Sequence, residues 1–349
     1  MSLVREIKLD LVPVAIALVF VAIVVATLNS VGLQTFKYKS VWLSIFIFSV
    51  LILHWTFARI LIIYIREKPE SPIKRTKEYF VEALSIHSLS RTVPIILCLL
   101  LFMPAFSSMK ASISIFSDYR WDDTFIYADR IIHGNDAWRV IHPIFGYPIV
   151  TSIINVLYHI WLALIYIITF YFAINYDLNK IRFQYITSFF LCWSIIGTVF
   201  AIIFASVGPC FLLPIQGDGT FVPLMDYLRS ADNTYSVPAL KVQDILLAQL
   251  RNGDSNLGAG ITAMPSMHVS IATLFYLAAR RLSSYLGYVF LAYLIAILIG
   301  SVHLGYHYAV DGYFAIACTV IIWKLTGWLA DYIQQADEVR PTQQLGIAT

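Results

Sequence analysis

The sequence predicts an all-α protein, a polytopic membrane bundle of about eight transmembrane helices with interfacial helices at its outer face. Composition is the first reason: 59% of the 349 residues are hydrophobic and 13% are charged, against about 25% charged residues in soluble domains. The second is a mean hydropathy of +0.75, carried by apolar runs of about 20 residues, long enough to cross a bilayer. The third is that Lys and Arg gather in alternate connections, as the positive-inside rule expects of cytoplasmic loops.

The first two spans precede a basic segment. The run 11–33 is too long for the core of a signal peptide, so a retained span is predicted there. A second span is expected over 41–64. The stretch 66–91 is the most basic of the chain and is predicted to be cytoplasmic, with its middle either an amphipathic helix on the inner surface or a solvated linker. Residues 1–92 are therefore expected to form an N-terminal region of two spans and a cytoplasmic segment.

The next part of the chain returns to the membrane. A third span is expected over 93–111, kinked by Pro104. Charged and aromatic side chains are interspersed over 117–147, which predicts a helix and turn lying on the outer interface. The fourth and fifth spans are expected over 148–174 and 185–205.

A long outer segment, 206–263, precedes the last spans. Its prolines and glycines rule out a continuous helix, but 239–250 has helical spacing and predicts a helix that either roofs a lipid entrance or packs on the bundle. The sixth span is expected to begin at Pro265. The seventh and eighth are expected over 284–302 and 310–329, which leaves both termini cytoplasmic. The membrane domain is thus predicted over 93–330 and a polar cytoplasmic tail over 331–349.

Two polar clusters, 264–268 and 303–311, are separated by one crossing out and one back, so they should return to the same membrane face. Pro265 is suited to the first position of a helix. The amides that follow would point out of the helix end and favour an anion such as phosphate. Ser266 adds a hydroxyl group and His268 a proton donor.

The second cluster contains an imidazole and a carboxylate at helical spacing. His307 and Asp311 are four residues apart, which would place them on one face of a helix, with His303 on the same stripe. A carboxylate that accepts one ring N–H of His307 would fix the tautomer and leave the other nitrogen free as a nucleophile. Ionisable groups near membrane spans are costly and usually functional.

Two other interpretations of these clusters remain open. The residues could be ordinary interfacial side chains. His303, His307 and Asp311 could also bind a zinc ion, although no further ligand set is evident and the Pro-Ser helix start would be unexplained. The four cysteines have no paired spacing typical of a disulfide framework or a metal motif.

The pair Pro265-Ser266-x-His268 and His307-x-x-x-Asp311 resembles the second and third motifs of the type 2 phosphatidic acid phosphatase superfamily. The resemblance implies a six-helix phosphatase-like core and catalysis without a metal or other cofactor. It implies that His307 forms a phosphohistidine and that Asp311 orients it. It also implies that His268 protonates the leaving oxygen and that Ser266 binds phosphate.

The sequence departs from the family pattern where phosphate-binding cations are expected. The third motif begins with Ser-Arg, but Gly300 and Ser301 stand at those positions, and the first motif is absent upstream of Met264. The sequence around His307 resembles that of the inositol phosphorylceramide synthases and their bacterial relatives. This branch of the superfamily moves phosphorylated head groups between lipids. The candidate substitutes for the missing cations are His303, Arg120, Arg130 and Arg139.

The predicted function is transfer of a phosphoryl or phosphorylated head group from a lipid phosphate or phospholipid to a polyol or sugar hydroxyl, or to water. The site is expected on the periplasmic, extracellular or lumenal face. A plain lipid phosphatase and a non-catalytic lipid-binding member of the same fold remain alternatives. A transporter is disfavoured because no internal repeat is visible and the ionisable residues lie at span ends. A net charge of +3 is too small to indicate a nucleic acid partner.

Overall fold

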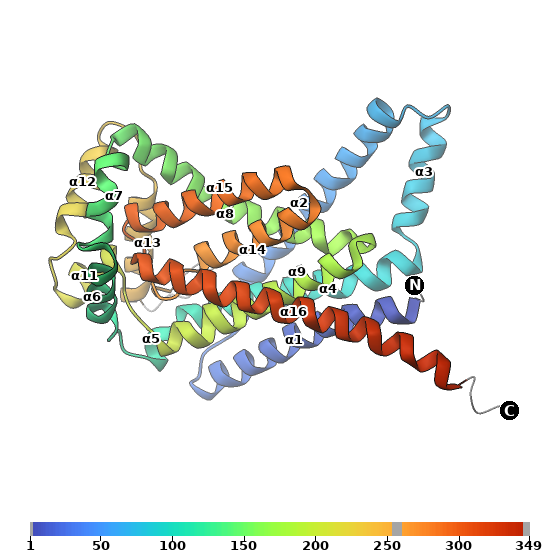
Figure 1. Ribbon diagram of the computed structural model, residues 1–349, viewed down its shortest axis with the longest axis horizontal. Coiled ribbons are helices and arrows are strands. Elements are labelled where there is room, and N and C mark those ends of the chain that lie inside the picture. Colours follow the sequence, from blue (N-terminus) through green and yellow to red (C-terminus); the bar gives the residue numbers. More distant parts are fainter. Residues whose placement is uncertain (1–2, 253–259, 345–349) are drawn as a thin grey trace.

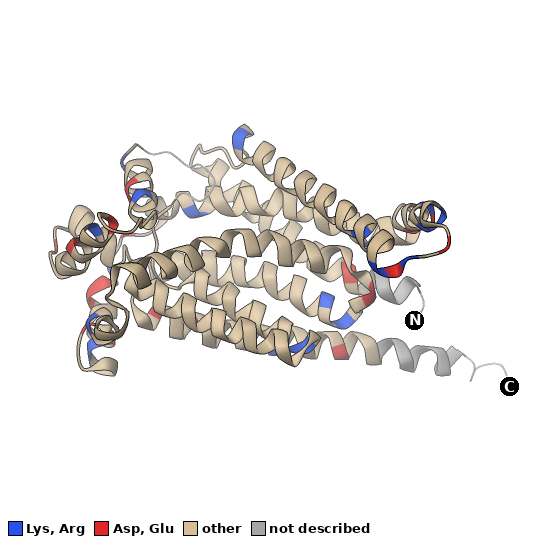
Figure 2. Cartoon of the chain, turned by 90° about the horizontal axis from the view of Figure 1, so that it is seen from above, with Lys and Arg blue, Asp and Glu red and all other residues tan. Residues whose placement is uncertain are grey.

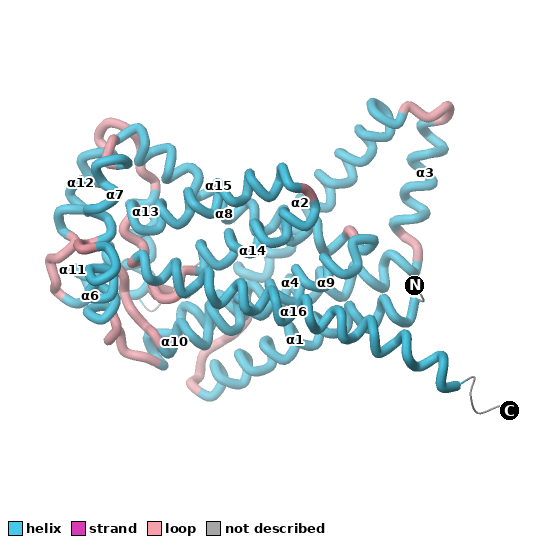
Figure 3. The backbone as a smooth tube through the Cα atoms, in the orientation of Figure 1, coloured by secondary structure: helices cyan, strands magenta, loops and turns pink. Residues whose placement is uncertain are grey.

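The structure is a computed structural model that describes residues 3–252 and 260–344, which form helices and loops and no β-strand (Figures 1 and 3). Seven of the described helices are long and apolar enough to cross a membrane. The protein is therefore an integral, multi-pass membrane protein, and the predicted all-α class is confirmed.

Two long helices precede a core of six helical segments. The first two are α1 (Leu3–Ser30), which packs on α4 and α9, and α2 (Tyr38–Ile62), which is continued by the π-helix η1 (Ile63–Glu67) and packs on α4 and α8. The core consists of α4 (Ile86–Ala111), α8 (Pro148–Ile174), α9 (Asn179–Leu191) with its continuations η3 (Cys192–Phe200) and α10 (Ala201–Ile203), α14 (Met267–Leu282), α15 (Ser284–His303) and α16 (Ala309–Gln344).

The sixth predicted span is shorter than the others. It corresponds to α14, which has 16 residues and is about 24 Å long at 1.5 Å per residue. The helix lies inside the bundle, packed by α8, α9, α15 and α16, and most of its residues are buried. Its neighbours supply polar partners inside the bundle, since the Ser270 hydroxyl lies 2.8 Å from that of Thr319 on α16.

The described termini lie at one end of the bundle, and a group of short helices lies at the other (Figure 1). Figure 2 shows that most charged residues lie at these two ends, as expected when the middle is in contact with lipid. At the terminal end, the basic segment contains the helix α3 (Pro72–Ala83), which Ser71 caps by accepting a hydrogen bond from the Lys74 N–H. Helix α16 continues well past the predicted end of the last span at residue 329.

Arg182 lies between the fourth and fifth spans that the sequence predicts, so it was expected in a connecting loop. It lies in α9, is only 1% exposed, and pairs with Asp10 of α1. Arg91 of α4 binds the other oxygen of Asp10 at 2.8 Å. Buried charges persist when they are paired and hydrogen-bonded, so this cluster ties α1, α4 and α9 together.

We call the short helices at the opposite end the cap helices. The helix and turn predicted over 117–147 are present as α6 and α7. The segment 206–263 contains three helices where only one was predicted, because Pro209 and Pro223 lie in the first turns of α11 and α12, where proline is tolerated. The cap helices are α6 (Asp122–His133), α7 (Ala137–Phe145), α11 (Pro209–Gln216), α12 (Val222–Asp232) and α13 (Ala239–Asn252).

Candidate active site

The chain between α15 and α16 is a loop over 304–308, and His307 lies in it. Gly305 turns the backbone with a φ of +74°, a conformation that suits glycine. The His307 N–H donates to the Ser301 carbonyl at 3.0 Å. The expectation that His303, His307 and Asp311 form one helical stripe is therefore wrong, because the helix ends at His303 and a new one begins at Ala309.

The His307 ring is held through one nitrogen. Its Nδ1 lies 2.7 Å from the carbonyl oxygen of Ala263 and 3.3 Å from Oδ2 of Asp311. A carbonyl can only accept, so Nδ1 carries the hydrogen and the neutral ring presents an unprotonated Nε2. The same Asp311 oxygen accepts the Tyr308 N–H at 3.0 Å. The backbone carbonyl of Ala263 is thus the nearer partner of the imidazole, with Asp311 beside it.

The first polar cluster starts α14. The helix begins at Met267, and Ser266 is its N-cap, with Oγ accepting the Val269 N–H at 3.4 Å. Pro265 therefore lies just before the cap and not at the first helical position that the sequence predicted. Ser266 is fully buried, and its N–H donates to the Asp311 carbonyl at 3.3 Å. The N–H groups of Met267 and His268 lie in the first turn, where backbone N–H groups have no acceptor within the helix and point out of its end.

His268 is held between aromatic side chains of α8. Its ring centroid lies 4.2 Å from that of Tyr158 and 4.0 Å from that of Trp161. The indole N–H of Trp161 donates to the His268 carbonyl at 3.1 Å. The ring centroids of His268 and His307 are 6.1 Å apart, so one tetrahedral group can contact both imidazoles.

Both imidazoles line a cavity of about 350 Å³ that we call the histidine cavity. Lys110 lines it together with His268 and His307, as do the polar side chains of Ser107, His159 and Thr262. Its other walls are largely apolar and come from α4, α8 and η3, with Phe106, Leu162, Ile165, Tyr166 and Trp193 among them. A cavity that combines a cation and two imidazoles with largely apolar walls suits a molecule that has a charged head and a hydrocarbon tail.

Lys110 is the residue that sequence reasoning missed. It lies in the last turn of α4, and the loop that precedes α14 crosses that turn. Gly260, with a φ of +95°, comes so close that a Cβ there would be 2.4 Å from the Lys110 carbonyl oxygen. The available signal was a single Lys at the outer end of an apolar span, and only the fold brings it to His268, about 160 residues later in the chain.

The predicted cationic substitutes do not line the histidine cavity. His303 turns away from it, and its Nε2 lies 2.8 Å from the Thr151 hydroxyl on α8. The arginines pair with neighbouring carboxylates of the cap end: Arg120 with Asp118 at 2.9 Å, and Arg130 and Arg139 with Asp136 at 2.5 and 3.3 Å. Ser266 is also absent from the wall of the cavity, because its hydroxyl group caps α14.

Close packing explains one departure from the family motif. A Cβ on Gly300 would lie 3.1 Å from Cγ2 of Ile154 and 3.2 Å from Cδ2 of Tyr158, so α15 and α8 touch at this position. Ser301 is fully buried, and an Arg side chain there would need space that the packed helices do not offer. The cation that does line the histidine cavity, Lys110, lies on a different helix, α4.

Two carboxylates of α6 anchor the cap to the loop that carries His307. Asp122 accepts the Val207 and Gly208 N–H groups at 3.0 and 2.9 Å and the Tyr308 hydroxyl at 2.8 Å. Burial and the adjacent Asp122 raise the pKa of Tyr308, which keeps this hydroxyl a donor. Asp129 binds the first amides of α16. The sequence predicted only that this segment lies on the outer interface, and it gave no sign that its aspartates bind the backbone of distant segments.

The side chains do not form an evident metal site. Over residues 3–252 and 260–344, no group of three or more His, Cys, Asp or Glu side chains is placed to hold an ion. His303 is separated from His307 by the break between α15 and α16, so the spacing that suggested zinc ligands is not realised. Metal-free catalysis stays a prediction, which a chelator can test.

Comparison with known proteins gives one match. A family model described as the PAP2 superfamily matches residues 123–325. The matched region runs from α6 into α16 and contains His268, His307 and Asp311, whereas Lys110 lies before it. Among curated proteins and among solved structures, no match to the chain was found.

Proposed function

The chain belongs to the PAP2 superfamily, and on that premise we propose that it is a membrane phosphotransfer enzyme that acts on a lipid phosphate or phosphodiester through a phosphohistidine. Membership by itself suggests lipid phosphatase or phosphotransferase activity. The observation that carries the finer proposal is the arrangement of His307 and His268, whose rings lie 6.1 Å apart and line one cavity with largely apolar walls.

The first step is attack on phosphorus by Nε2 of His307. The N–P bond forms with the lone pair of Nε2, and the bond from phosphorus to the leaving oxygen breaks. His268 gives a proton to that oxygen, a contribution typically worth about 10²–10⁴-fold. The positive charge that develops on His307 is stabilised through its Nδ1–H by the Ala263 carbonyl and the Asp311 carboxylate.

Charge on the other phosphoryl oxygens needs donors that are already in place. Lys110 supplies a cation that lines the same cavity, and the amides of Met267 and His268 supply the positive end of the α14 dipole. While His268 carries a proton, the faces of Tyr158 and Trp161 favour its positive charge. This set replaces the arginine that the family motif would place at Ser301.

The second step reverses the roles. A hydroxyl oxygen or water attacks phosphorus, the N–P bond breaks with its electron pair returning to His307, and His268 accepts the proton of the acceptor.

The lipid tail lies along the apolar walls between α4 and α8. Basic residues concentrate at the terminal end of the bundle, so by the positive-inside rule the site faces the outer leaflet. Head-group transfer, as in the inositol phosphorylceramide synthase branch, is the favoured reaction.

The test is turnover of a lipid panel by purified protein, comparing phosphatidic acid with phosphodiester lipids, with and without glycerol or inositol. Released phosphate identifies a phosphatase and a new lipid identifies a transferase. His307→Ala should abolish both products, while His54→Ala, an exposed residue of α2, should retain them. Full turnover by well-folded His307→Ala would contradict the phosphohistidine. Absence of any product from wild type would favour a lipid-binding member of the fold.

A further inference from the structure

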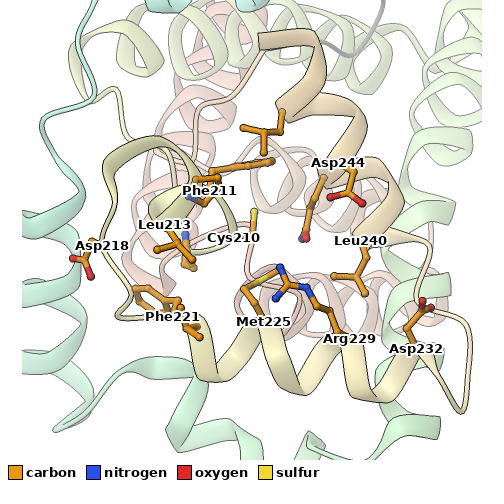
Figure 4. Close-up of a pocket in the computed structure, with 15 residues that line it drawn as sticks. Cys210, Phe211, Leu213, Asp218, Phe221, Met225, Arg229, Asp232, Leu240 and Asp244 are labelled. Atoms are coloured by element: carbon orange, nitrogen blue, oxygen red, sulfur yellow. The ribbon is translucent and has the colours of Figure 1, made fainter. Parts of the chain in front are cut away.

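A second cavity, of about 460 Å³, lies among the cap helices α11, α12 and α13 (Figure 4). We call it the outer pocket. Its volume is in the range of small-molecule sites, about 300–1,000 Å³. The mechanism proposed above does not use it. Figure 4 shows Arg229 extending from its helix into the middle of the pocket, below Cys210, with Leu240 and Asp244 on another side.

The outer pocket rests on the loop that carries His307. Cys210, which lines the pocket, donates its N–H to the Gly305 carbonyl at 2.8 Å. Gln243, which also lines it, donates from Nε2 to the Leu304 carbonyl at 2.9 Å. Phe211 lines both the outer pocket and the histidine cavity. The two cavities therefore share one aromatic side chain as a wall.

The polar lining indicates the kind of ligand. Asp218, Asp232 and Asp244 line the pocket with a single guanidinium, that of Arg229. Asp218 accepts the Thr220 N–H and hydroxyl, and Asp232 accepts the Val237 N–H, whereas no hydrogen bond to the other described residues occupies Asp244. Excess negative charge repels a free anion, whereas carboxylates accept hydrogen bonds from hydroxyl groups. Gln243 is only 4% exposed, and its Oε1 has no hydrogen-bond partner among the described residues. A buried acceptor without a partner is costly, and a ligand hydroxyl would satisfy it.

We propose that the outer pocket binds a neutral, hydroxyl-rich group, either the polyol head group of a phosphodiester lipid or a free polyol or sugar acceptor. The proposal rests on the proposed function, because only chemistry at His307 gives such a group a role. Rotation of the Phe211 side chain would join the two cavities. An acceptor hydroxyl would then form a bond to phosphorus as the N–P bond to His307 breaks, and its proton would pass to His268.

Asp244 offers a direct binding test. It is exposed, and no hydrogen bond or ion pair joins it to the other described residues, so Asp244→Asn should fold normally. Saturation-transfer NMR with myo-inositol, glycerol and mannose should detect binding to wild type. Asp244→Asn should weaken the apparent affinity about tenfold, as expected for a hydrogen bond to a charged group. Asp123→Asn, an exposed carboxylate of α6 outside the pocket, is the matched control and should bind as wild type does.

Binding and turnover separate this proposal from the proposed function. If none of the three polyols binds, or if Asp244→Asn binds them as well as wild type, the outer pocket proposal is overturned even when phosphatidic acid is hydrolysed. If a polyol binds in the pocket but no lipid is turned over, the proposed function fails and the binding site stands.

Kinetics distinguish the two sources of the hydroxyl group. A higher KM of Asp244→Asn for phosphatidylinositol, with that for phosphatidic acid less affected, would assign the pocket to the donor head group. A higher KM for free inositol, in transfer from phosphatidic acid, would assign it to the acceptor. Unchanged KM values for both inositol-containing substrates would contradict the proposal.

Discussion

The carboxylate of Asp129 on α6 receives the backbone N–H of Ala309, the first residue of α16, at 2.9 Å. Its other oxygen receives the Val310 N–H at 3.0 Å. A cap helix thereby supplies the N-terminal cap of the helix that carries Asp311, immediately after the loop that carries His307. The positions of the catalytic candidates thus depend on a residue that is far from them in sequence.

Asp129→Asn should therefore lower kcat about tenfold, because the amide has only one acceptor oxygen and loses the charge that favours a helix N-terminus. Steady-state kinetics with phosphatidic acid would measure it. Asp123→Asn, on an exposed position of the same helix, should keep wild-type kcat. Equal kcat in Asp129→Asn and Asp123→Asn would show that the cap does not position His307.

Asp311→Asn should lower turnover about 10²–10⁴-fold without unfolding the protein. The Asn side chain can still accept the Tyr308 N–H, but it no longer offers a negative charge to the His307 imidazolium. Turnover and thermal unfolding should be measured together. The control is Asp331→Asn. Asp331 lies on the same helix and pairs with Lys180. Turnover of Asp311→Asn close to that of Asp331→Asn would remove the carboxylate from the mechanism.

Lys110→Met should reduce kcat about 10²–10³-fold, the usual effect of losing one preorganised donor to a developing anion. Lys110→Arg should restore part of the lost kcat because it restores the positive charge. The recovery should be incomplete because a planar guanidinium group differs in shape from a compact ammonium group. Lys39→Met, an exposed residue of α2, is the control. If Lys110→Met turns over lipid at the rate of Lys39→Met, Lys110 does not stabilise the transition state.

His303→Asn should lower stability and not chemistry. It breaks the hydrogen bond between His303 Nε2 and Thr151, whose hydroxyl still has the Tyr227 hydroxyl as a partner. The cost should therefore be that of one lost hydrogen bond, about 0.5–1.5 kcal/mol. The expected result is a lower Tm, with kcat per folded protein within about twofold of wild type. A large fall in kcat at unchanged Tm would instead support His303 as a phosphate donor.

Chelation should leave turnover unchanged. The proposed charge stabilisation uses Lys110 and helix amides, so dialysis against EDTA followed by assay in EDTA should not reduce phosphate release or lipid transfer. Restoration of lost activity by zinc or magnesium would revive a metal-dependent mechanism. Apoprotein prepared in this way should also keep its helical circular dichroism, which separates loss of a catalytic ion from unfolding.

Much of the fold follows from local pattern. Apolar runs of spanning length have to form helices in lipid, because no water satisfies their backbone groups. The span expected over 148–174 matches α8 at both ends. The ends of the other helices differ from the predicted ends by several residues. The fifth span begins before residue 185, and Arg182 is buried in it because its guanidinium pairs with the carboxylate of Asp10 on α1.

The sequence by itself determined that His268 and His307 share one end of the bundle, since one crossing out and one back restores the face. The predicted pair of His307 and Asp311 is also present, but the contact is made from a loop and not along one helix. Only the tertiary structure decided that His303 faces Thr151, that the Ala263 carbonyl holds His307, and that Lys110 lines the same cavity as the two imidazoles. The physical reason is that hydrophobicity and spacing along a chain determine where helices form. The rotation of each helix, and the partners that come from distant segments, depend on how all the helices pack together.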